Sequence, residues 1–289
     1  MTEKISIVGG KGGTGKTLIA VNLAYLLSLR DRTLLVDADA DNPCIKPFFE
    51  AEKIWEEEVA EFRPRIMESV CTLCGKCVAH CPEHALALIP GKRTILIESL
   101  CSGCGVCRII CPANAIKDSW IKSGSISGYA VNDRLELIVG ELTPTCKRSA
   151  TIIMKALETA EKSSKGHGYV VVDAPPGTGA GIYSIIKFSD IVMAVTEPTP
   201  LGLNDLKKLY RLFMKFFSDK QLYVIVNKHG LPGGSEEDLR RFLKDEGISW
   251  LKVPYDDLVV ESYVAGRILV KDYPSSRAAE AIKKIAEEI

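Results

Sequence analysis

The stretch from Gly10 to Thr17, G-K-G-G-T-G-K-T, most constrains what this chain can fold into. It satisfies the pattern G-x-x-x-x-G-K-[ST], and it stands between a short β-branched run at residues 5–8 and an apolar helical pattern that begins at Leu18. Such a loop presents backbone N–H groups to phosphate at the amino end of a helix, where the helix dipole also favours an anion. The sequence therefore predicts a strand, a phosphate-binding loop and a helix.

Strand and helix patterns alternate on both sides of a central interruption. A second strand is predicted at 33–36, and the alternation resumes after about residue 138. The further expected helices are 149–162, 203–217 and 236–245, and the further expected strands are 169–172, 191–195 and 222–226. Such alternation implies right-handed crossovers and a mostly parallel sheet with helices on both faces, so the predicted class is α/β.

The interruption contains most of the cysteines. Ten cysteines in a chain with no export signal indicate metal ligation, because cytosolic thiols are kept reduced. Eight of them form two copies of C-x-x-C-x-x-C-x-x-x-C-P, at residues 71–82 and 101–112, which indicates a duplication. We therefore expect an inserted module at 62–118 within a discontinuous domain made of residues 1–61 and 119–289.

The cysteine spacing is typical of bacterial ferredoxins, in which three close thiolates hold one cluster and the fourth cysteine ligates the other. By that rule the ligands are Cys71, Cys74, Cys77 and Cys111 for one [4Fe-4S] cluster, and Cys101, Cys104, Cys107 and Cys81 for the second. Two structural four-cysteine zinc sites are the alternative, although zinc pairs usually come as two separated C-x-x-C units. The segment resembles a two-cluster ferredoxin, which implies a small α+β module.

Several side chains around the phosphate loop have predicted roles. The nucleotide-binding residues predicted in the loop are Gly10, Lys11, Gly12, Gly13, Thr14, Gly15, Lys16 and Thr17. Lys16 is expected to reach the β- and γ-phosphates, and the Thr17 hydroxyl is expected to bind Mg²⁺. Asp173 ends an apolar run at 169–173 and is expected to hold Mg²⁺ through water, as a Walker B aspartate does.

The second lysine of the loop, Lys11, is distinctive. The string G-K-G-G-T-G-K-T resembles the deviant Walker A motif shared by MinD, ParA, Mrp and the nitrogenase iron protein. This resemblance implies an ATP-dependent homodimer in which Lys11 reaches the partner's nucleotide. It also implies slow, Mg²⁺-dependent ATP hydrolysis that a dimer or a partner stimulates, with Lys11, Lys16 and Asp39 as the catalytic residues.

The same resemblance extends to later segments. Residues 37–43 resemble switch I of that superfamily, D-x-D-x-x-x-P, and D-A-P-P-G-T-G at 173–179 resembles the Mrp branch. Asp39 is expected to orient the attacking water or accept its proton, and Asp37 to support Mg²⁺ or the switch. Asn227 and Pro254 match the family's adenine-side segments, so ATP and ADP are the expected nucleotides. For Asn227 the alternative is a helix cap or a turn.

The chain departs from better-known relatives at its remaining cysteines. No cysteine follows Cys146, so the late C-x-x-C of Mrp-type cluster carriers is absent. Cys146 resembles one bridging cysteine of the nitrogenase iron protein, but the other is replaced after Asp173 by proline and glycine. We interpret Cys146 as a non-ligand, because two thiolates at a dimer axis do not complete a four-thiolate site. Cys44 is interpreted as a small packing residue.

Charge and hydropathy bear on the partners. The 37 basic and 37 acidic residues cancel, so no global field attracts nucleic acid or an anionic membrane. The apolar runs are too short to cross a bilayer, and no signal peptide is recognised. Residues 275–289 mix both charges, unlike the basic membrane helix of MinD, and are expected to pack on the sheet. We expect a cytoplasmic protein with no nucleic-acid or membrane partner.

Three functions remain open from the sequence. The first, which we favour, is an ATP-binding and hydrolysing iron-sulfur protein that couples nucleotide state to electron transfer through two [4Fe-4S] clusters. The second is an Mrp-type ATPase that assembles or carries clusters for an apo-protein. The third is a MinD- or ParA-like regulatory switch whose clusters sense redox state or stabilise the fold. The sequence does not identify the redox or apo-protein partner.

Overall fold

The structure is a computed structural model that describes residues 2–144, 146, 148–234 and 236–289. It divides the chain into two compact units. The first unit comprises Met1–Glu57, Ile126–Glu141 and Ser149–Ile289, and the second comprises Glu58–Ser125 and Leu142–Arg148. The predicted insert at 62–118 lies within the second unit. The chain passes into that unit within strand β3 (Glu52–Ile66) and returns within strand β6 (Ile116–Asn132).

The first unit is built on a parallel sheet. Besides β3 and β6, the strands of this sheet are β1 (Glu3–Val8), β2 (Thr33–Asp37), β7 (Leu135–Leu142), β8 (Tyr169–Asp173), β9 (Ile191–Thr196), β10 (Gln221–His229) and β11 (Trp250–Pro254). The strand order of the whole sheet is β11-β10-β9-β1-β8-β2-β7-β6-β3, and the pairings from β11 to β7 are all parallel. Their carboxyl ends therefore share one edge, which is where ligands of open α/β sheets bind.

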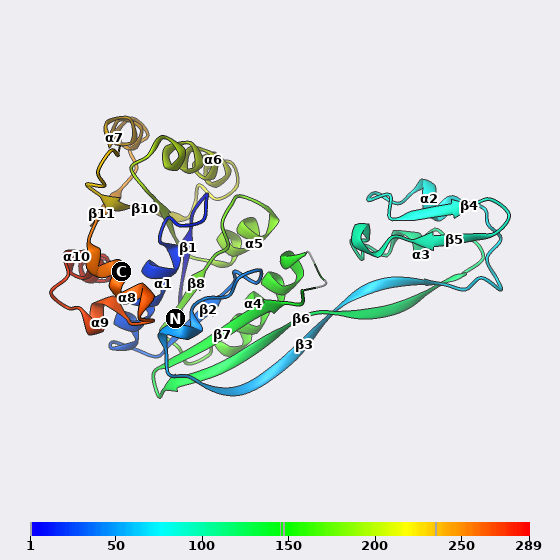
Figure 1. The fold of residues 1–289 in the computed structure, drawn as a ribbon, viewed down its shortest axis with the longest axis horizontal. Coiled ribbons are helices and arrows are strands. Elements are labelled where there is room, and N and C mark those ends of the chain that lie inside the picture. Colours follow the sequence, from blue (N-terminus) through cyan, green and yellow to red (C-terminus); the bar gives the residue numbers. More distant parts are fainter. Residues whose placement is uncertain (1, 145, 147, 235) are drawn as a thin grey trace. The chain divides into compact units, whose positions relative to one another are not determined.

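Helices cover both faces of this sheet (Figure 1). They are α1 (Lys16–Ser28), α4 (Ser149–Ser163), α5 (Ala180–Phe188), α6 (Pro200–Phe216), α7 (Glu236–Asp245), α8 (Asp257–Val264), α9 (Leu269–Asp272) and α10 (Arg277–Glu287), with a short 3-10 helix at Lys46–Phe48. One apolar core joins α1, α9 and α10 to residues such as Ile5 and Ile7 on one face. On the other face α4 packs on β2, α5 on β1 and α6 on β9. The α/β prediction is confirmed.

The C-terminal helix α10 belongs to that core. Ala278, Ile282 and Ile285 are buried in the core on one side of the helix, while Lys284 and Glu287 are exposed on its other side. This placement agrees with the expectation that residues 275–289 pack on the domain. In the part of the chain that the structure describes, no helix has both the length and the apolar character needed to cross a membrane.

The second unit is small and internally repeated. It contains the short helices α2 (Lys76–Ala79) and α3 (Val106–Ile109), the antiparallel strands β4 (Leu86–Ile89) and β5 (Arg93–Leu96), and a 3-10 helix at Glu98–Leu100. The two cysteine runs share an unusual backbone, with positive φ at the paired positions Leu73 and Gly103, Gly75 and Gly105, and His84 and Asn114. Matching left-handed turns at matching positions agree with the duplication seen in the sequence.

The long strands were not predicted. The sequence suggested a loop-rich segment between residues 62 and 119, whereas β3 and β6 are 15 and 17 residues long and extend into that range from either end. The reason lies in their composition. β3 carries Glu56, Glu57 and Glu58 in succession, and its exposed residues do not alternate with buried ones until Val59, so the period-2 pattern of a half-buried strand is missing.

The apolar core makes a first testable prediction. Leu23 is fully buried within α1, and Leu29, the residue after the end of the same helix, is 59% exposed. Leu23→Ala should lower the free energy of unfolding by about 2–5 kcal/mol, because it removes buried surface and leaves a cavity. Leu29→Ala should change it by less than about 0.5 kcal/mol. Urea denaturation followed by circular dichroism measures both, and equal losses would contradict the described packing.

Candidate functional site

The phosphate loop joins the end of β1 to the start of α1 and is held by a neighbouring strand. The side-chain amide of Asn227, on β10, donates a hydrogen bond to the Thr14 carbonyl at 2.8 Å. Gly15 has φ +95°, and a Cβ atom there would lie 2.1 Å from the Asn227 amide nitrogen. Only glycine fits this position, because a side chain would collide with the residue that holds the loop. Asn227 therefore lies beside the loop, as the sequence predicts.

Lys16 lies at the first position of α1 and is buried to 93%. Its Nζ donates to the Lys11 carbonyl at 3.0 Å. Burial lowers the pKa of Lys16, and the charges of Asp173 and Asp39 oppose this change. A buried ammonium with one neutral acceptor at the amino end of a helix favours an anion as a further partner. The geometry thus suits the phosphate role predicted for Lys16.

A candidate Mg²⁺ site lies next to it. The Thr17 hydroxyl donates to Asp173 Oδ2 at 2.6 Å, and Asp173 is completely buried at the end of β8. Burial raises the pKa of Asp173 well above its usual range, and the nearby Asp37 raises it further. The other oxygen, Oδ1, has no hydrogen-bond partner among the described residues. An unsatisfied carboxylate oxygen beside a hydroxyl is the kind of oxygen donor set that fits Mg²⁺.

Asp37 shapes the loop that follows β2. Its Oδ2 accepts hydrogen bonds from the backbone N–H groups of Cys44 at 2.7 Å and Ile45 at 3.0 Å, and its Oδ1 accepts one from Asp39 at 3.2 Å. Burial raises the pKa of Asp37 to about 7, although these three hydrogen bonds oppose the change. These contacts order the loop, and the switch role and the Mg²⁺ role expected for Asp37 both stay predictions.

Asp39 is half-buried in this loop. Burial raises its pKa, and the charge of Lys16 lowers it, so the two side chains lie close enough to interact. Cys44 lies beside the candidate Mg²⁺ site, with its Sγ 3.6 Å from the Thr17 hydroxyl, and its interpretation as a packing residue stays a prediction. Burial raises the pKa of the Cys44 thiol to about 11, which makes it a neutral neighbour of the candidate Mg²⁺ site.

Sequence reasoning missed two charged residues at this edge. The carboxylate of Glu197 lies 2.6 Å from Lys11 Nζ through Oε1 and 2.9 Å from Lys228 Nζ through Oε2. Lys228 Nζ also donates to the Gly13 carbonyl at 2.8 Å. Glu197 directly follows β9 and Lys228 lies near the end of β10, so the rule that sites form at carboxyl ends of parallel strands could have identified both. Pro254 ends β11 and pairs in register with His229.

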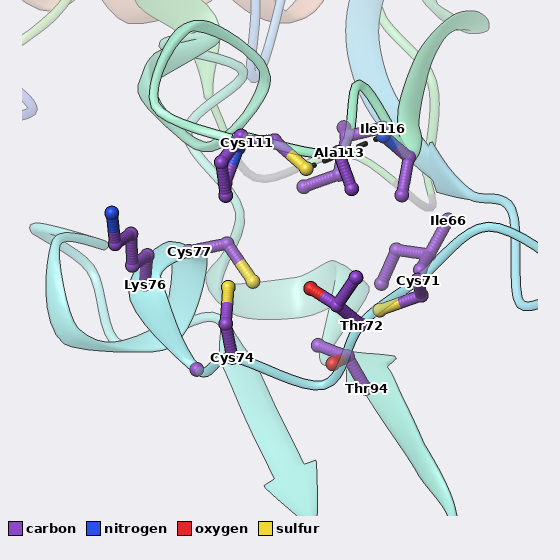
Figure 2. Close-up of a pocket in the computed structure, with 13 residues that line it drawn as sticks. Ile66, Cys71, Thr72, Cys74, Lys76, Cys77, Thr94, Cys111, Ala113 and Ile116 are labelled. Carbon is purple, nitrogen blue, oxygen red and sulfur yellow. Dashed lines mark hydrogen bonds between the residues drawn. The ribbon is translucent and has the colours of Figure 1, made fainter.

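The second unit brings the repeated cysteines together in two sets. Cys71, Cys74, Cys77 and Cys111 line one cavity, and the sticks in Figure 2 show all four around a common space. Cys81, Cys101, Cys104 and Cys107 line a second cavity. Each run therefore supplies three cysteines to one cavity and its fourth to the other, which is the interleaved arrangement expected from the spacing.

The donor chemistry of the cavities fits an iron-sulfur cluster. Backbone N–H groups of Ala85 and Ala115 donate to Cys81 Sγ and Cys111 Sγ, each at 3.3 Å. Burial raises the pKa of Cys107 to about 11, so this thiol needs a metal cation to be held as thiolate. Within the described residues no group of three or more His, Cys, Asp or Glu side chains is arranged around a single ion. Four thiols spread around a cavity suit a cofactor that is ligated at its corners.

Cys146 belongs to neither set. It is buried in the second unit, with its Sγ 4.0 Å from Glu61 Oε2, and it is not among the residues that line either cavity. Glu61 in turn forms a buried ion pair with Arg63 at 3.2 Å. Cys146 therefore lies outside both cysteine sets, and its interpretation as a non-ligand stays a prediction.

The raised pKa of Asp37 predicts a pH dependence for the protein without nucleotide or Mg²⁺. The folded chain keeps the Asp37 proton up to about pH 7, whereas the unfolded chain releases it near the ordinary value of 3.8. The stabilising contribution of this proton is therefore complete at low pH and lost as the pH rises to about 7. The unfolding free energy of the wild type minus that of Asp37→Asn should therefore fall as the pH rises to about 7, as measured by urea titrations at a series of pH values. A difference that stays constant or grows would contradict the assignment.

Comparison with known proteins agrees with this geometry. A model of the CobQ/CobB/MinD/ParA nucleotide binding domain matches residues 5–270. The uncharacterized protein MJ0578 of Methanocaldococcus jannaschii is 32% identical over 99% of this chain and 96% of that protein. The iron-sulfur cluster carrier protein of Aquifex aeolicus is 27% identical over 98% of this chain and 66% of its own length. The septum site-determining protein MinD of Pyrococcus horikoshii, complexed with Mg-ADP, superposes with a TM-score of 0.56 and 20% identity over 100% of this chain and 96% of that one. The chain belongs to the CobQ/CobB/MinD/ParA nucleotide-binding family.

Proposed function

We propose that this protein binds and hydrolyses ATP with Mg²⁺, and that its nucleotide state governs electron transfer through two [4Fe-4S] clusters in the second unit. The observation that carries the proposal is the arrangement of eight cysteines in two interleaved sets of four, each around its own cavity, in a chain with a phosphate loop. Both kinds of site lie in one polypeptide, and a function that uses only one of them leaves the other unexplained.

The nucleotide half of the proposal has support from geometry and from relatives. Lys16 is a buried cation at the phosphate loop, and Thr17 and Asp173 offer oxygen donors beside it. The similar MinD from Pyrococcus horikoshii is described as a complex with Mg-ADP. We propose that Lys16 binds the β- and γ-phosphates, that Thr17 and Asp173 hold Mg²⁺, and that Asp39 orients the attacking water.

The cluster half depends on the cysteine sets. When bound, such clusters supply one-electron transfer, commonly at low potential. Cys71, Cys74, Cys77 and Cys111 would hold one, and Cys101, Cys104, Cys107 and Cys81 the other. The N–H groups of Ala85 and Ala115 stabilise negative charge on the sulfur atoms that they contact. Because each run contributes to both sets, the cofactors would also join the two halves of the unit.

A covalent route connects the two functions. Asp37 fixes the backbone of residues 39–45, and the chain that leaves this loop continues through β3 into the second unit. A γ-phosphate beside Asp39 favours one arrangement of this loop over another, and any such preference acts on the chain that enters β3. The proposal therefore assigns the switch loop the role of transmitting nucleotide state.

A second candidate function is supported by the names of relatives, of which the Aquifex aeolicus protein is one. The Aquifex aeolicus protein is named an iron-sulfur cluster carrier protein, so the clusters of this chain are cargo in that alternative. The two candidates differ in the fate of iron and sulfide. A carrier transfers both rapidly to an apo-ferredoxin, whereas an electron carrier keeps them while its acceptor is reduced.

Metal analysis tests the cluster ligands. Cys71→Ala/Cys74→Ala should reduce the iron content of the anaerobically reconstituted protein from about eight to about four atoms per chain, with an equal loss of acid-labile sulfide. The matched control Cys44→Ala/Cys146→Ala changes two cysteines outside both cavities and should keep about eight iron atoms. Zinc without sulfide in the wild-type protein would establish the alternative zinc sites.

Anaerobic redox titration tests the coupling. A non-hydrolysable ATP analogue should shift the midpoint potential of a cluster by tens of millivolts, where about 59 mV corresponds to a tenfold change in equilibrium. Alternatively it should change the rate at which the clusters reduce a dye acceptor. Lys16→Ala should abolish either effect, because it removes the phosphate ligand but leaves the cysteines intact. If the wild type binds the analogue and neither potential nor rate changes, the coupling is wrong.

A further inference from the structure

The environment of Lys11 differs from what an intersubunit role requires. Its ammonium lies 2.6 Å from Glu197 Oε1 within the same chain. Glu197 is only 6% exposed, and its second oxygen is occupied by Lys228 at 2.9 Å. The Thr199 hydroxyl is a third neighbour of the carboxylate, 3.3 Å from Oε1. One buried carboxylate therefore binds two ammonium groups, and Lys11 is one of them.

The charges explain why this pair is well defined. Burial alone raises the pKa of Glu197, but the hydrogen bonds and charges of Lys11 and Lys228 lower it below the ordinary value. Carboxylates with charged donors make the stronger hydrogen bonds of proteins, and loss of Lys11 would leave Glu197 with Lys228 and Thr199 as its partners. Lys11 leaves this carboxylate most readily when another anion takes its place. A triphosphate on a partner chain is such an anion.

Lys228 connects the pair to the phosphate loop. Its Nζ donates to the Gly13 carbonyl at 2.8 Å as well as to Glu197. The residue has φ +54°, a left-handed conformation that non-glycine side chains seldom adopt and that the surrounding structure must maintain. Lys228 therefore connects Glu197 to the phosphate loop, and the other oxygen of Glu197 contacts Lys11. The arrangement lies entirely within the first unit.

We propose that Glu197 is a positioning residue that retains Lys11 within its own chain until a nucleotide-loaded partner displaces it. The inference deepens the proposed function and rests on it, because it assumes the proposed ATP binding together with the ATP-dependent homodimer that the sequence resemblance implies. Glu197 therefore opposes this pairing. The Lys11–Glu197 ion pair must open before Lys11 can contact the partner's nucleotide, so unpaired chains with weakly bound or absent nucleotide stay monomeric.

The test is a set of substitutions measured by the monomer–dimer equilibrium. With a saturating non-hydrolysable ATP analogue and Mg²⁺, Glu197→Gln should lower the protein concentration for half-dimerisation about tenfold, because it removes the charge that retains Lys11. In a Lys11→Ala background, Glu197→Gln should have no further effect, because the residue acts only through Lys11. Analytical ultracentrifugation measures all four proteins of this cycle. A purely structural role of Glu197 would not depend on Lys11.

Two comparisons complete the experiment. Glu136→Gln is the matched control, since it removes a carboxylate paired with Arg32 at 2.7 Å elsewhere in the first unit, and it should leave dimerisation unchanged. If Glu197→Gln does not fold, Glu197→Asp keeps the charge but retracts it by one methylene from the lysines. It should lower the half-dimerisation concentration in the same direction.

The outcomes separate this inference from the proposed function. Dimerisation of Glu197→Gln equal to or weaker than that of the wild type would overturn the retaining role while ATP-dependent pairing stands. An effect that persists in the Lys11→Ala background would overturn it as well. Failure of the wild type to bind the analogue would overturn the proposed function and this inference together.

Discussion

Two buried carboxylates placed side by side set the requirements of the nucleotide site. Asp37 and Asp173 end the neighbouring strands β2 and β8 and are paired in register, and both are completely buried. Like charges in such a position raise each other's pKa, so the site needs compensating donors or cations. Asp37 receives three backbone N–H groups, whereas Asp173 receives one hydroxyl and has an oxygen without a partner among the described residues. The two carboxylates therefore differ in what they can do. Asp37 orders a loop, and this oxygen of Asp173 is available to a cation.

The second unit is also expected to depend on a bound cation, which its cysteine sulfur atoms would ligate. Its apolar core is small, formed by Leu86, Cys107 and Ile116 with a few partly buried neighbours. Short segments with so little buried surface usually depend on a metal or a cross-link for stability. Three of the cysteines that would bind the clusters, Cys77, Cys107 and Cys111, also belong to this core or pack against it, so metal binding and folding of the unit are expected to be coupled. Loss of a cluster would then change the conformation of the unit as well as its redox chemistry.

Features that depend on short sequence motifs could be predicted, whereas contacts between residues far apart in the chain could not. The phosphate loop and the aspartate at the end of β8 were recognisable because their chemistry depends on residues at fixed short spacings, and the parallel sheet followed from the alternation of strands and helices. The cysteine sets followed from a repeat of the same kind. Glu197 and Lys11 are nearly two hundred residues apart in sequence, and only the parallel order β10-β9-β1 brings their strand ends together. The contact of Cys44 with Thr17 could not be predicted, because nothing in the neighbouring sequence indicates it. The strand β3 was not predicted because a run of glutamates hides its pattern.

Without nucleotide, the lysines of the phosphate loop are bound by acceptors of their own chain. Each cation that would bind phosphate already has an acceptor, since Lys16 contacts the Lys11 carbonyl and Lys11 contacts Glu197. These acceptors are unequal. A carbonyl is neutral and is readily exchanged for a phosphate oxygen, whereas a buried carboxylate carries a full charge and holds an ammonium group more strongly. In the proposed mechanism, nucleotide binding within one chain opens only the weaker contact, and the contact of Lys11 opens at a later step. The proposed order, binding followed by pairing, rests on this difference between an amide oxygen and a carboxylate.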